Sequence, residues 1–325
     1  MKVFVTGGSG FVGGHCIKRL LADEHSVVAP ARHEVACKRL RALGASSTVL
    51  EYADPAALKQ AMAGCDAAVH IAAHLKMWGA WEDFEVSNVT LTDQVLKAAT
   101  ACSIKRFVHV SAASVVMQEA MPITHADESW PLTELRHLPY SSTKAIAESH
   151  VLAAHSDGFS TVALRPPLIW GPGDMVDGDF GDRVRKRQFA WISRGEYPYA
   201  TCHVQNLCQA IALALRSEVT GAYFLTDDED ITLREFITQR LHASGLETPR
   251  MSVPAPVAWL MGKGMEKLWA TGWLPGEPPL TRELVRLIGY PFTLDISRAK
   301  TVLGYKPEIT IREGMSRVRG SGLEL

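Results

Sequence analysis

Hydrophobic positions along the chain alternate between two spacings, one typical of strands and one typical of helices. An apolar run over residues 2–6 is followed by a stretch over 11–22 in which Phe11, Ile17 and Leu20 fall at helical spacing. The same patterns predict further strands over residues 25–31, 47–51, 67–71, 106–111 and 160–165, and further helices over 34–43, 55–63, 88–101 and 140–154. Strands that alternate with helices indicate βαβ units. We therefore predict an α/β fold with a doubly wound parallel sheet covered by helices on both faces.

The regular alternation ends after residue 165. Prolines and glycines crowd residues 166–181 and interrupt regular structure. We expect residues 1–165 to form a dinucleotide-binding domain, to which residues 201–226 return with a strand and a buried helix. Residues 166–200 and 227–325 are then expected to form a smaller, mostly helical lobe, called the substrate lobe below.

The composition is that of a globular protein. With 47% hydrophobic and 21% charged residues, the chain does not resemble a disordered, collagen-like or coiled-coil protein. Lys+Arg 34 against Asp+Glu 35 gives a net charge of −1, so no broad basic surface is expected and no nucleic-acid partner is predicted. The six cysteines form no Cys-x-x-Cys pair, and the N-terminal apolar run is far shorter than the core of a signal peptide. We expect a cytoplasmic protein.

Three glycines stand between the first predicted strand and the first predicted helix. Gly7, Gly10 and Gly13 would permit a tight turn, a close approach of backbone N–H groups to a pyrophosphate, and close packing of the helix on the sheet. The helix N-terminus would then face the anion with its partial positive charge. Because the glycines stand in this strand–helix context, they predict a dinucleotide-binding site.

The end of the second predicted strand indicates which dinucleotide is bound. A carboxylate there would accept a hydrogen bond from a ribose 2′-hydroxyl, whereas an arginine would suit a 2′-phosphate. The segment holds no carboxylate, and Arg32 follows it directly. We therefore expect NADP to be preferred over NAD, although Arg32 as a solvated residue at the start of a helix remains the alternative.

Tyr140 and Lys144 lie four residues apart, on one face of a predicted helix. A phenol is a poor acid or base near neutral pH unless a neighbouring cation stabilises the phenolate, and Lys144 could supply that charge. A hydroxyl at the end of the preceding strand would bind the substrate oxygen. Ser111 and Ser114 are the candidates, and ordinary serines at a strand end are the alternative for each.

These motifs together resemble the extended short-chain dehydrogenases/reductases, the NAD-dependent epimerase/dehydratase superfamily. The resemblance covers nearly the whole chain and adds matches at Asn88, at residues 165–174 and at residues 203–206. Residues 278–282 and 303–307 and the apolar segment 254–273 look most like the 3β-hydroxysteroid dehydrogenase group. The resemblance to the superfamily implies a Rossmann-type sheet. It also implies that the cofactor is bound by Gly7, Gly10, Phe11, Val12, Gly13, Arg32, Glu51, Ala72, Ala73, Asn88, Tyr140, Lys144 and Pro167. The catalytic hydroxyl of the family aligns with Ala112, so either Ser111 or Ser114 would replace it or the activity would be weak.

The resemblance implies reversible hydride transfer between NAD(P) and a secondary alcohol or ketone on a largely apolar substrate. A nucleotide-sugar epimerase or dehydratase is the first alternative, and a non-catalytic sensor or scaffold that binds NADP is the second. The apolar stretch 253–273 is expected to pack on the core, with contact to a membrane surface as the less favoured interpretation. A homodimer is left open. No metal site is predicted, because His70 and His74 fall at the end of a strand, where their spacing does not make a metal pair.

Overall fold

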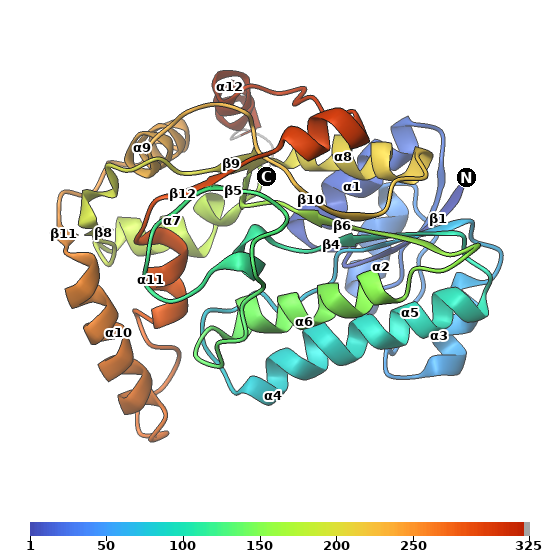
Figure 1. Cartoon of the computed structure of the whole chain (residues 1–325), viewed down its shortest axis with the longest axis horizontal. Coiled ribbons are helices and arrows are strands. Elements are labelled where there is room, and N and C mark those ends of the chain that lie inside the picture. The colour runs from blue at the N-terminus through green and yellow to red at the C-terminus, as the bar shows by residue number, and fades with distance from the viewer. Residues whose placement is uncertain (322–325) are drawn as a thin grey trace.

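A parallel sheet of six strands lies at the centre of the molecule, whose computed structural model describes residues 1–321 (Figure 1). The strands follow the order β10-β6-β4-β3-β1-β2. Their bounds are β1 Lys2–Thr6, β2 Ser26–Val28, β3 Ala67–His70, β4 Arg106–Val110, β6 Ser160–Arg165 and β10 Gly221–Phe224. The predicted α/β, doubly wound parallel fold is confirmed.

The strand order reverses beside β1, which pairs with β2 on one side and with β3 on the other. In sheets of this kind ligands bind in the crevice outside the carboxyl ends of the strands, at the reversal point. Thr6 and His70 form the last residue pair of β1 and β3, at the carboxyl ends of these strands. The topology therefore places a ligand site beyond these two residues.

Helices cover the sheet in two layers (Figure 1). One layer holds α1 Phe11–Ala22, α2 Glu34–Ala42 and α8 Val204–Arg216, and the other holds α3 Pro55–Met62, α5 Leu91–Ala101 and α6 Pro139–Ala153. All five residues of β4 are buried, as expected for a strand covered on both faces.

Two predicted elements differ from the observed ones. The strand predicted over residues 47–51 is reduced to isolated bridges, Val28 with Ser46 and Ala31 with Val49. Between them the Ala29 carbonyl accepts a hydrogen bond from the Ser47 hydroxyl (2.7 Å), which interrupts the backbone ladder. The helix predicted over 88–101 is α-helical only from Leu91. It follows the short α4 Trp81–Phe84 and a π-helical turn, Glu85–Thr90, in which Asn88 points inward.

The remaining elements lie mainly beyond residue 165. They are β5 Ile123–Ala126, β7 Leu168–Trp170, α7 Asp179–Arg185, β8 Trp191–Ile192, β9 Thr201–His203, α9 Leu233–Ala243, β11 Ser252–Val253, α10 Ala255–Trp269, α11 Arg282–Ile288, β12 Phe292–Leu294 and α12 Ile311–Ser321, with short 3-10 or π-helical turns at Ala113–Val116, Met175–Asp177, Ser193–Gly195 and Ala299–Leu303. Helix α8 packs against α1, and β10 adds to the sheet beside β6. The division into a dinucleotide-binding domain and a substrate lobe stays a prediction.

A buried carboxylate explains the motif at residues 203–206. Asp227 accepts hydrogen bonds from Trp170 Nε1 (2.7 Å), Thr201 Oγ1 (2.8 Å), the His203 backbone (2.6 Å) and Asn206 Nδ2 (2.8 Å). Asn206 Oδ1 accepts from the backbone N–H groups of Glu308 and Ile309, each at 2.9 Å. This network joins the returning segment to the C-terminal part of the chain, so the motif holds the fold together. Within residues 1–321, no helix combines the length and the apolar character needed to cross a membrane.

Candidate active site

The glycine loop after β1 has a geometry that only glycine permits at two positions. Gly7 has φ +70°, and the Gly10 N–H donates to its carbonyl (3.1 Å). A Cβ at Gly13 would lie 2.1 Å from the Gly7 carbonyl oxygen, and a Cβ at Gly7 would lie 2.7 Å from the Ala72 nitrogen. The loop is thus folded tightly onto α1 and onto the segment that follows β3.

The first turn of α1 is open to an anion. Gly10 is its N-cap and gives no side-chain hydrogen bond, and no acidic residue lies in the first turn. The N–H groups at the start of a helix have no intrahelical partner, so those of Phe11, Val12 and Gly13 are available to a diphosphate. The Ala72 and Ile71 N–H groups donate to Thr6 Oγ1, each at 3.1 Å, which fixes the neighbouring loop against the glycines. The N–H groups at the start of α1 and the fixed loop beside them are therefore suited to bind the diphosphate of a dinucleotide.

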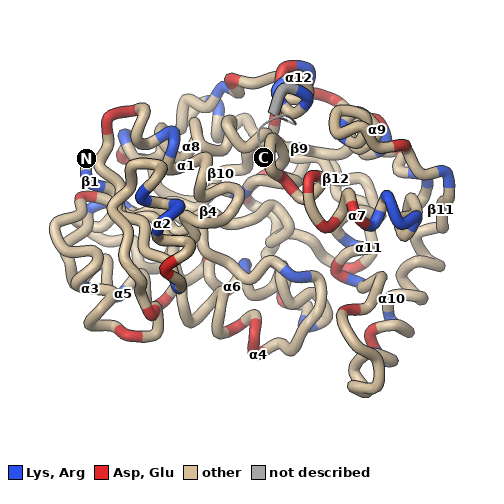
Figure 2. The backbone as a smooth tube through the Cα atoms, turned by 180° about the vertical axis from the view of Figure 1, so that it is seen from behind, with Lys and Arg blue, Asp and Glu red and all other residues tan. Residues whose placement is uncertain are grey.

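The residues expected at the adenine end lie in two exposed segments. Arg32 lies between β2 and α2, and Figure 2 shows basic residues along α2. Glu51 accepts a hydrogen bond from the Ala53 N–H (3.2 Å) in its own turn. Tyr52 donates to the Pro30 carbonyl (3.0 Å) and holds the two segments side by side.

Asn88 joins two parts of the site. Its Oδ1 accepts from the His74 N–H (2.7 Å), and its Nδ2 donates to Thr143 Oγ1 (3.0 Å). The side chain therefore links the loop after Ala72 and Ala73 to α6, one residue before Lys144. These two hydrogen bonds fix the position of this loop relative to α6.

Tyr140 lies in the first turn of α6, and Lys144 follows one turn later. Lys144 Nζ donates to the Val110 carbonyl (2.8 Å) and to His109 Nε2 (3.3 Å), and burial lowers its pKa to about 8. Among residues 1–321 the Tyr140 hydroxyl has no hydrogen-bond partner. Burial, and then the Glu283 carboxylate, raises the pKa of Tyr140 above its ordinary value.

Glu283 is a site residue that the sequence did not reveal. Its carboxylate reaches from α11 and accepts from the backbone N–H of Tyr140 (3.2 Å), the backbone N–H of Ser141 (3.3 Å) and the Ser141 hydroxyl (2.5 Å). It caps the positive end of the helix that carries Tyr140. Burial raises the pKa of Glu283 to about 7. In the sequence, only its position directly after the matching segment 278–282 pointed to it, because no spacing rule links residues 143 positions apart.

The two candidate serines lie where β4 ends. The Ser111 N–H donates to the Leu164 carbonyl and the Ala113 N–H to the Pro166 carbonyl, each at 2.8 Å, which holds this segment beside Pro167. Ser111 Oγ and Ser114 Oγ are both buried, and neither has a hydrogen-bond partner in the described part of the chain. A buried hydroxyl without a partner costs about 1–3 kcal/mol, which a ligand oxygen would offset.

A pair of stacked histidines lies beneath the site. His70 and His109 have ring centroids 5.3 Å apart, and His70 bonds the Thr6 hydroxyl through Nδ1 (2.7 Å) and Thr92 Oγ1 through Nε2 (2.9 Å). Both His70 nitrogens are thus used by threonines. Burial, followed by the Lys144 charge, lowers the pKa of His70 to about 3 and that of His109 well below 6.5. The two rings are neutral supports of β3, β4 and Lys144.

Because His70 is neutral in the folded protein, we predict that the free energy of unfolding falls in acid. The folded pKa of His70 lies below its unfolded pKa, so the contribution is complete above pH 6.5 and declines as the pH falls toward 3. At pH 5 the loss is about 2 kcal/mol, at roughly 1.4 kcal/mol per pH unit. Urea unfolding at pH 7 and pH 5 measures it, and His70→Gln is expected to reduce the difference by this amount. The exposed His155→Gln is the control, and an equal pH dependence in the wild type and in His70→Gln would contradict this role.

Comparison with known proteins agrees with this geometry. The chain matches the 3-beta hydroxysteroid dehydrogenase/isomerase family over residues 4–255. It is 36% identical to the 4-hydroxy-2-methyl-3-oxo-4-farnesyl-3,4-dihydroquinoline-1-oxide ketoreductase of Stigmatella aurantiaca, over 99% of this chain and 97% of that protein. It is 35% identical to the 2-alkyl-3-oxoalkanoate reductase of Stenotrophomonas maltophilia, over 99% of each.

A solved structure shares the fold. The dTDP-glucose 4,6-dehydratase DesIV of Streptomyces venezuelae, crystallised with NAD, superposes with a TM-score of 0.75 at 21% identity, over 99% of this chain and 96% of that one. At this identity the likeness extends to the architecture alone. The match over most of the chain and the two full-length relatives show that the chain belongs to the 3-beta hydroxysteroid dehydrogenase/isomerase family of NAD(P)-dependent oxidoreductases.

Proposed function

We propose that this chain transfers hydride between NADP and a secondary alcohol or ketone on a largely apolar substrate. The observation that carries the proposal is that three features lie at one edge of the sheet: an open glycine loop, a tyrosine hydroxyl and buried serine hydroxyls. Neither the tyrosine nor the serine hydroxyls have a hydrogen-bond partner within residues 1–321. Lys144 brings the last two together, because it lies on the helix of Tyr140 and bonds the carbonyl of Val110, the residue before Ser111.

The bound nicotinamide would supply or accept the hydride. Tyr140 would give its hydroxyl proton to the ketone oxygen during reduction and take it back during oxidation. Its raised pKa keeps the phenol protonated at neutral pH, which is the form that reduction needs. Lys144, with a pKa near 8, is mostly charged at pH 7 and would stabilise the phenolate that forms.

Ser111 or Ser114 would bind the substrate oxygen in place of the hydroxyl that is missing at Ala112. Both hydroxyls lie in the segment that runs from β4 into the turn Ala113–Val116. A donor of this kind contributes roughly 2.7–4 kcal/mol to a transition state, so its presence separates an efficient enzyme from a weak one.

The names of the two full-length relatives favour an apolar ketone over a sugar nucleotide as the substrate. Their names describe reduction of a ketone on a farnesyl-bearing ring and on an alkyl-branched oxoalkanoate. The structural neighbours that act on sugar nucleotides are less similar in sequence, 21% identical in the case of DesIV.

A turnover assay tests the proposed function. Purified protein with NADPH is expected to consume the cofactor when given a branched 3-oxoalkanoate or a hydroxysteroid-like ketone, and to leave UDP- and dTDP-glucose unchanged. Saturable conversion of the sugar nucleotides alone would replace this proposal by the epimerase or dehydratase alternative.

The preference for NADP depends on Arg32. We expect Arg32→Ala to weaken NADP binding about tenfold, since a charge-assisted contact to the 2′-phosphate is lost, and to leave NAD binding unchanged. Arg39→Ala is the matched control, because Arg39 is an exposed arginine of the adjoining helix α2. Calorimetric titration with both dinucleotides measures the effect, and equal weakening of both would refute this assignment.

A cytoplasmic location is proposed from the cysteines, because all six are free thiols in the structure. Contact of residues 253–273 with a membrane surface stays a prediction, with Val257, Leu260 and Leu268 of α10 exposed. A homodimer stays a prediction as well.

A further inference from the structure

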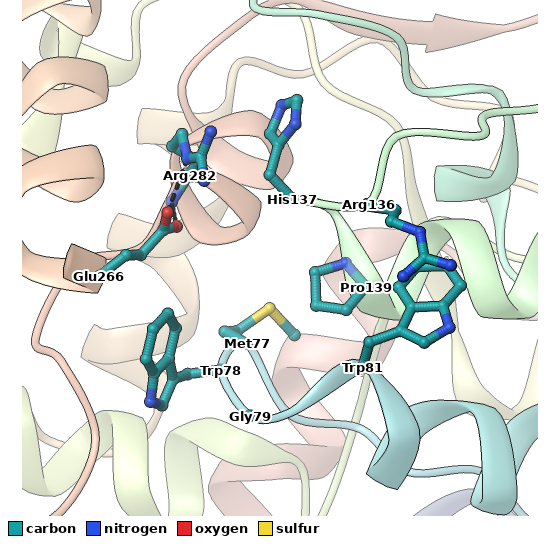
Figure 3. Close-up of a pocket in the computed structure, with 9 residues that line it drawn as sticks. All are labelled: Met77, Trp78, Gly79, Trp81, Arg136, His137, Pro139, Glu266 and Arg282. Carbon is teal, nitrogen blue, oxygen red and sulfur yellow. Dashed lines mark hydrogen bonds and ion pairs between the residues drawn. The ribbon is translucent and has the colours of Figure 1, made fainter. Parts of the chain in front are cut away.

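A small pocket opens beside the first turn of α6 (Figure 3). Its volume is about 150 Å³, and Pro139, the residue before Tyr140, forms part of its wall. The pocket is smaller than the roughly 300–1,000 Å³ that hold a complete small ligand. It therefore has room for one end of a larger molecule and not for a complete substrate.

One side of the pocket is apolar. Met77 and Trp78 come from the loop between β3 and α4, a few residues after the segment that contacts the glycine loop, and Trp81 is the first residue of α4. In Figure 3, Met77 and Pro139 lie between Trp78 on one side and Trp81 on the other. This wall is continuous in the chain with the cofactor edge and suits an alkyl chain or a ring.

The charged residues of the pocket leave one cation without a counter-ion. Arg282 is neutralised by Glu266, which it contacts at 2.6 Å through Nε. Burial, and then the Arg282 charge, lowers the pKa of His137, so the imidazole is neutral at pH 7. Arg136 lies with its guanidinium 4.9 Å from the centre of the Trp81 ring, and no carboxylate within residues 1–321 forms an ion pair with it.

We propose that this pocket binds an acidic group of the substrate, with Arg136 as its partner, so that the natural substrate is an apolar ketone or alcohol that carries a carboxylate. A guanidinium binds a carboxylate through two parallel hydrogen bonds, and the stacking on Trp81 holds its plane in place. Met77, Trp78 and Pro139 would contact the adjoining carbon chain. The inference rests on the proposed function and names the substrate class of that site.

Matched substrates test the inference. The wild-type protein is compared with Arg136→Gln on freshly prepared 3-oxodecanoate and on its methyl ester, which has the same ketone and no charge. We expect Arg136→Gln to raise KM for the acid about tenfold or more, with kcat little changed and KM for the ester unaltered. Arg234→Gln is the control, because Arg234 stacks on Trp191 at 5.0 Å in the same manner outside the pocket. Equal melting temperatures of the three proteins exclude a general loss of structure.

The outcomes separate the inference from the proposed function. If the wild type reduces acid and ester with the same KM, or if Arg136→Gln changes both alike, the acid pocket is refuted while the ketoreductase proposal stands. If neither compound is reduced, the proposed function fails on these substrates, and titration with decanoate decides the inference by itself. Saturable binding of decanoate that Arg136→Gln weakens tenfold supports the pocket, and absent or equal binding overturns it.

Discussion

Replacing Tyr140 by phenylalanine is expected to lower turnover of a confirmed ketone substrate by about 10²- to 10⁴-fold, the usual contribution of a positioned proton donor. The change removes one oxygen, and that oxygen makes no hydrogen bond within the described chain, so folding should be unaffected. The Glu283 cap on the first turn of α6 uses backbone N–H groups and the Ser141 hydroxyl, and it is retained in the variant.

Steady-state kinetics with NADPH measures this effect, and calorimetry shows whether the variant still binds the dinucleotide. Tyr290→Phe is the matched control, because Tyr290 is also half-buried and its hydroxyl has no hydrogen bond within residues 1–321. Unchanged turnover in Tyr140→Phe would show that another group donates the proton. Binding of NADP without any turnover by the wild type would favour the sensor or scaffold instead.

Replacing Gly13 by alanine is expected to weaken dinucleotide binding about 100-fold or more, because overpacking against backbone atoms costs up to about 3 kcal/mol. The added Cβ would lie 2.1 Å from the Gly7 carbonyl oxygen and 2.6 Å from the Gly8 Cα. Neither atom can rotate away, so the loop itself must shift from the position that presents its N–H groups to a diphosphate.

The neighbouring residue provides a control of the same size and chemistry. A Cβ at Gly14 would meet nothing within 4 Å, so Gly14→Ala should bind both dinucleotides normally and gain up to about 1 kcal/mol of stability from helix propensity. Titration of the two variants with NADP separates the loop geometry from general effects on α1. Equal affinities in both would mean that the glycine loop does not hold the diphosphate.

The fold could be predicted because its signals are local. Alternating strand and helix patterns, each confined to one short segment of the chain, predicted the sheet, and five predicted strands recur as β1, β2, β3, β4 and β6. The missing strand at 47–51 and the π-helical turn before α5 show the limit of this approach. The contact of the Ser47 hydroxyl with the Ala29 carbonyl and the hydrogen bonds of the buried Asn88 involve residues far apart in the sequence, which no local pattern contains.

Some residues of the candidate site could be predicted from local patterns, and others could not. Residues 7–13 and the pair Tyr140 and Lys144 were predicted because their chemistry needs a short, fixed spacing. The sequence did not point to Glu283, His109 or Arg136. Glu283 and His109 contact residues that are far from them in the sequence, and Arg136 lines a pocket that only the fold creates. For the serines, the sequence left two candidates at the end of β4, and the structure adds that both hydroxyls are buried with no hydrogen-bond partner among residues 1–321.

The Glu283 contact sets a rule for building chimaeras from members of this family. Glu283, which caps the helix of Tyr140, lies on α11. Replacing the segment that contains α11 by that of another protein therefore also replaces the residue that caps α6. A crossover placed after residue 288 keeps the native cap, whereas a crossover before residue 282 exchanges it together with the donor sequence. Hybrids whose donor lacks an acid at position 283 would leave the first turn of α6 uncapped beside Tyr140.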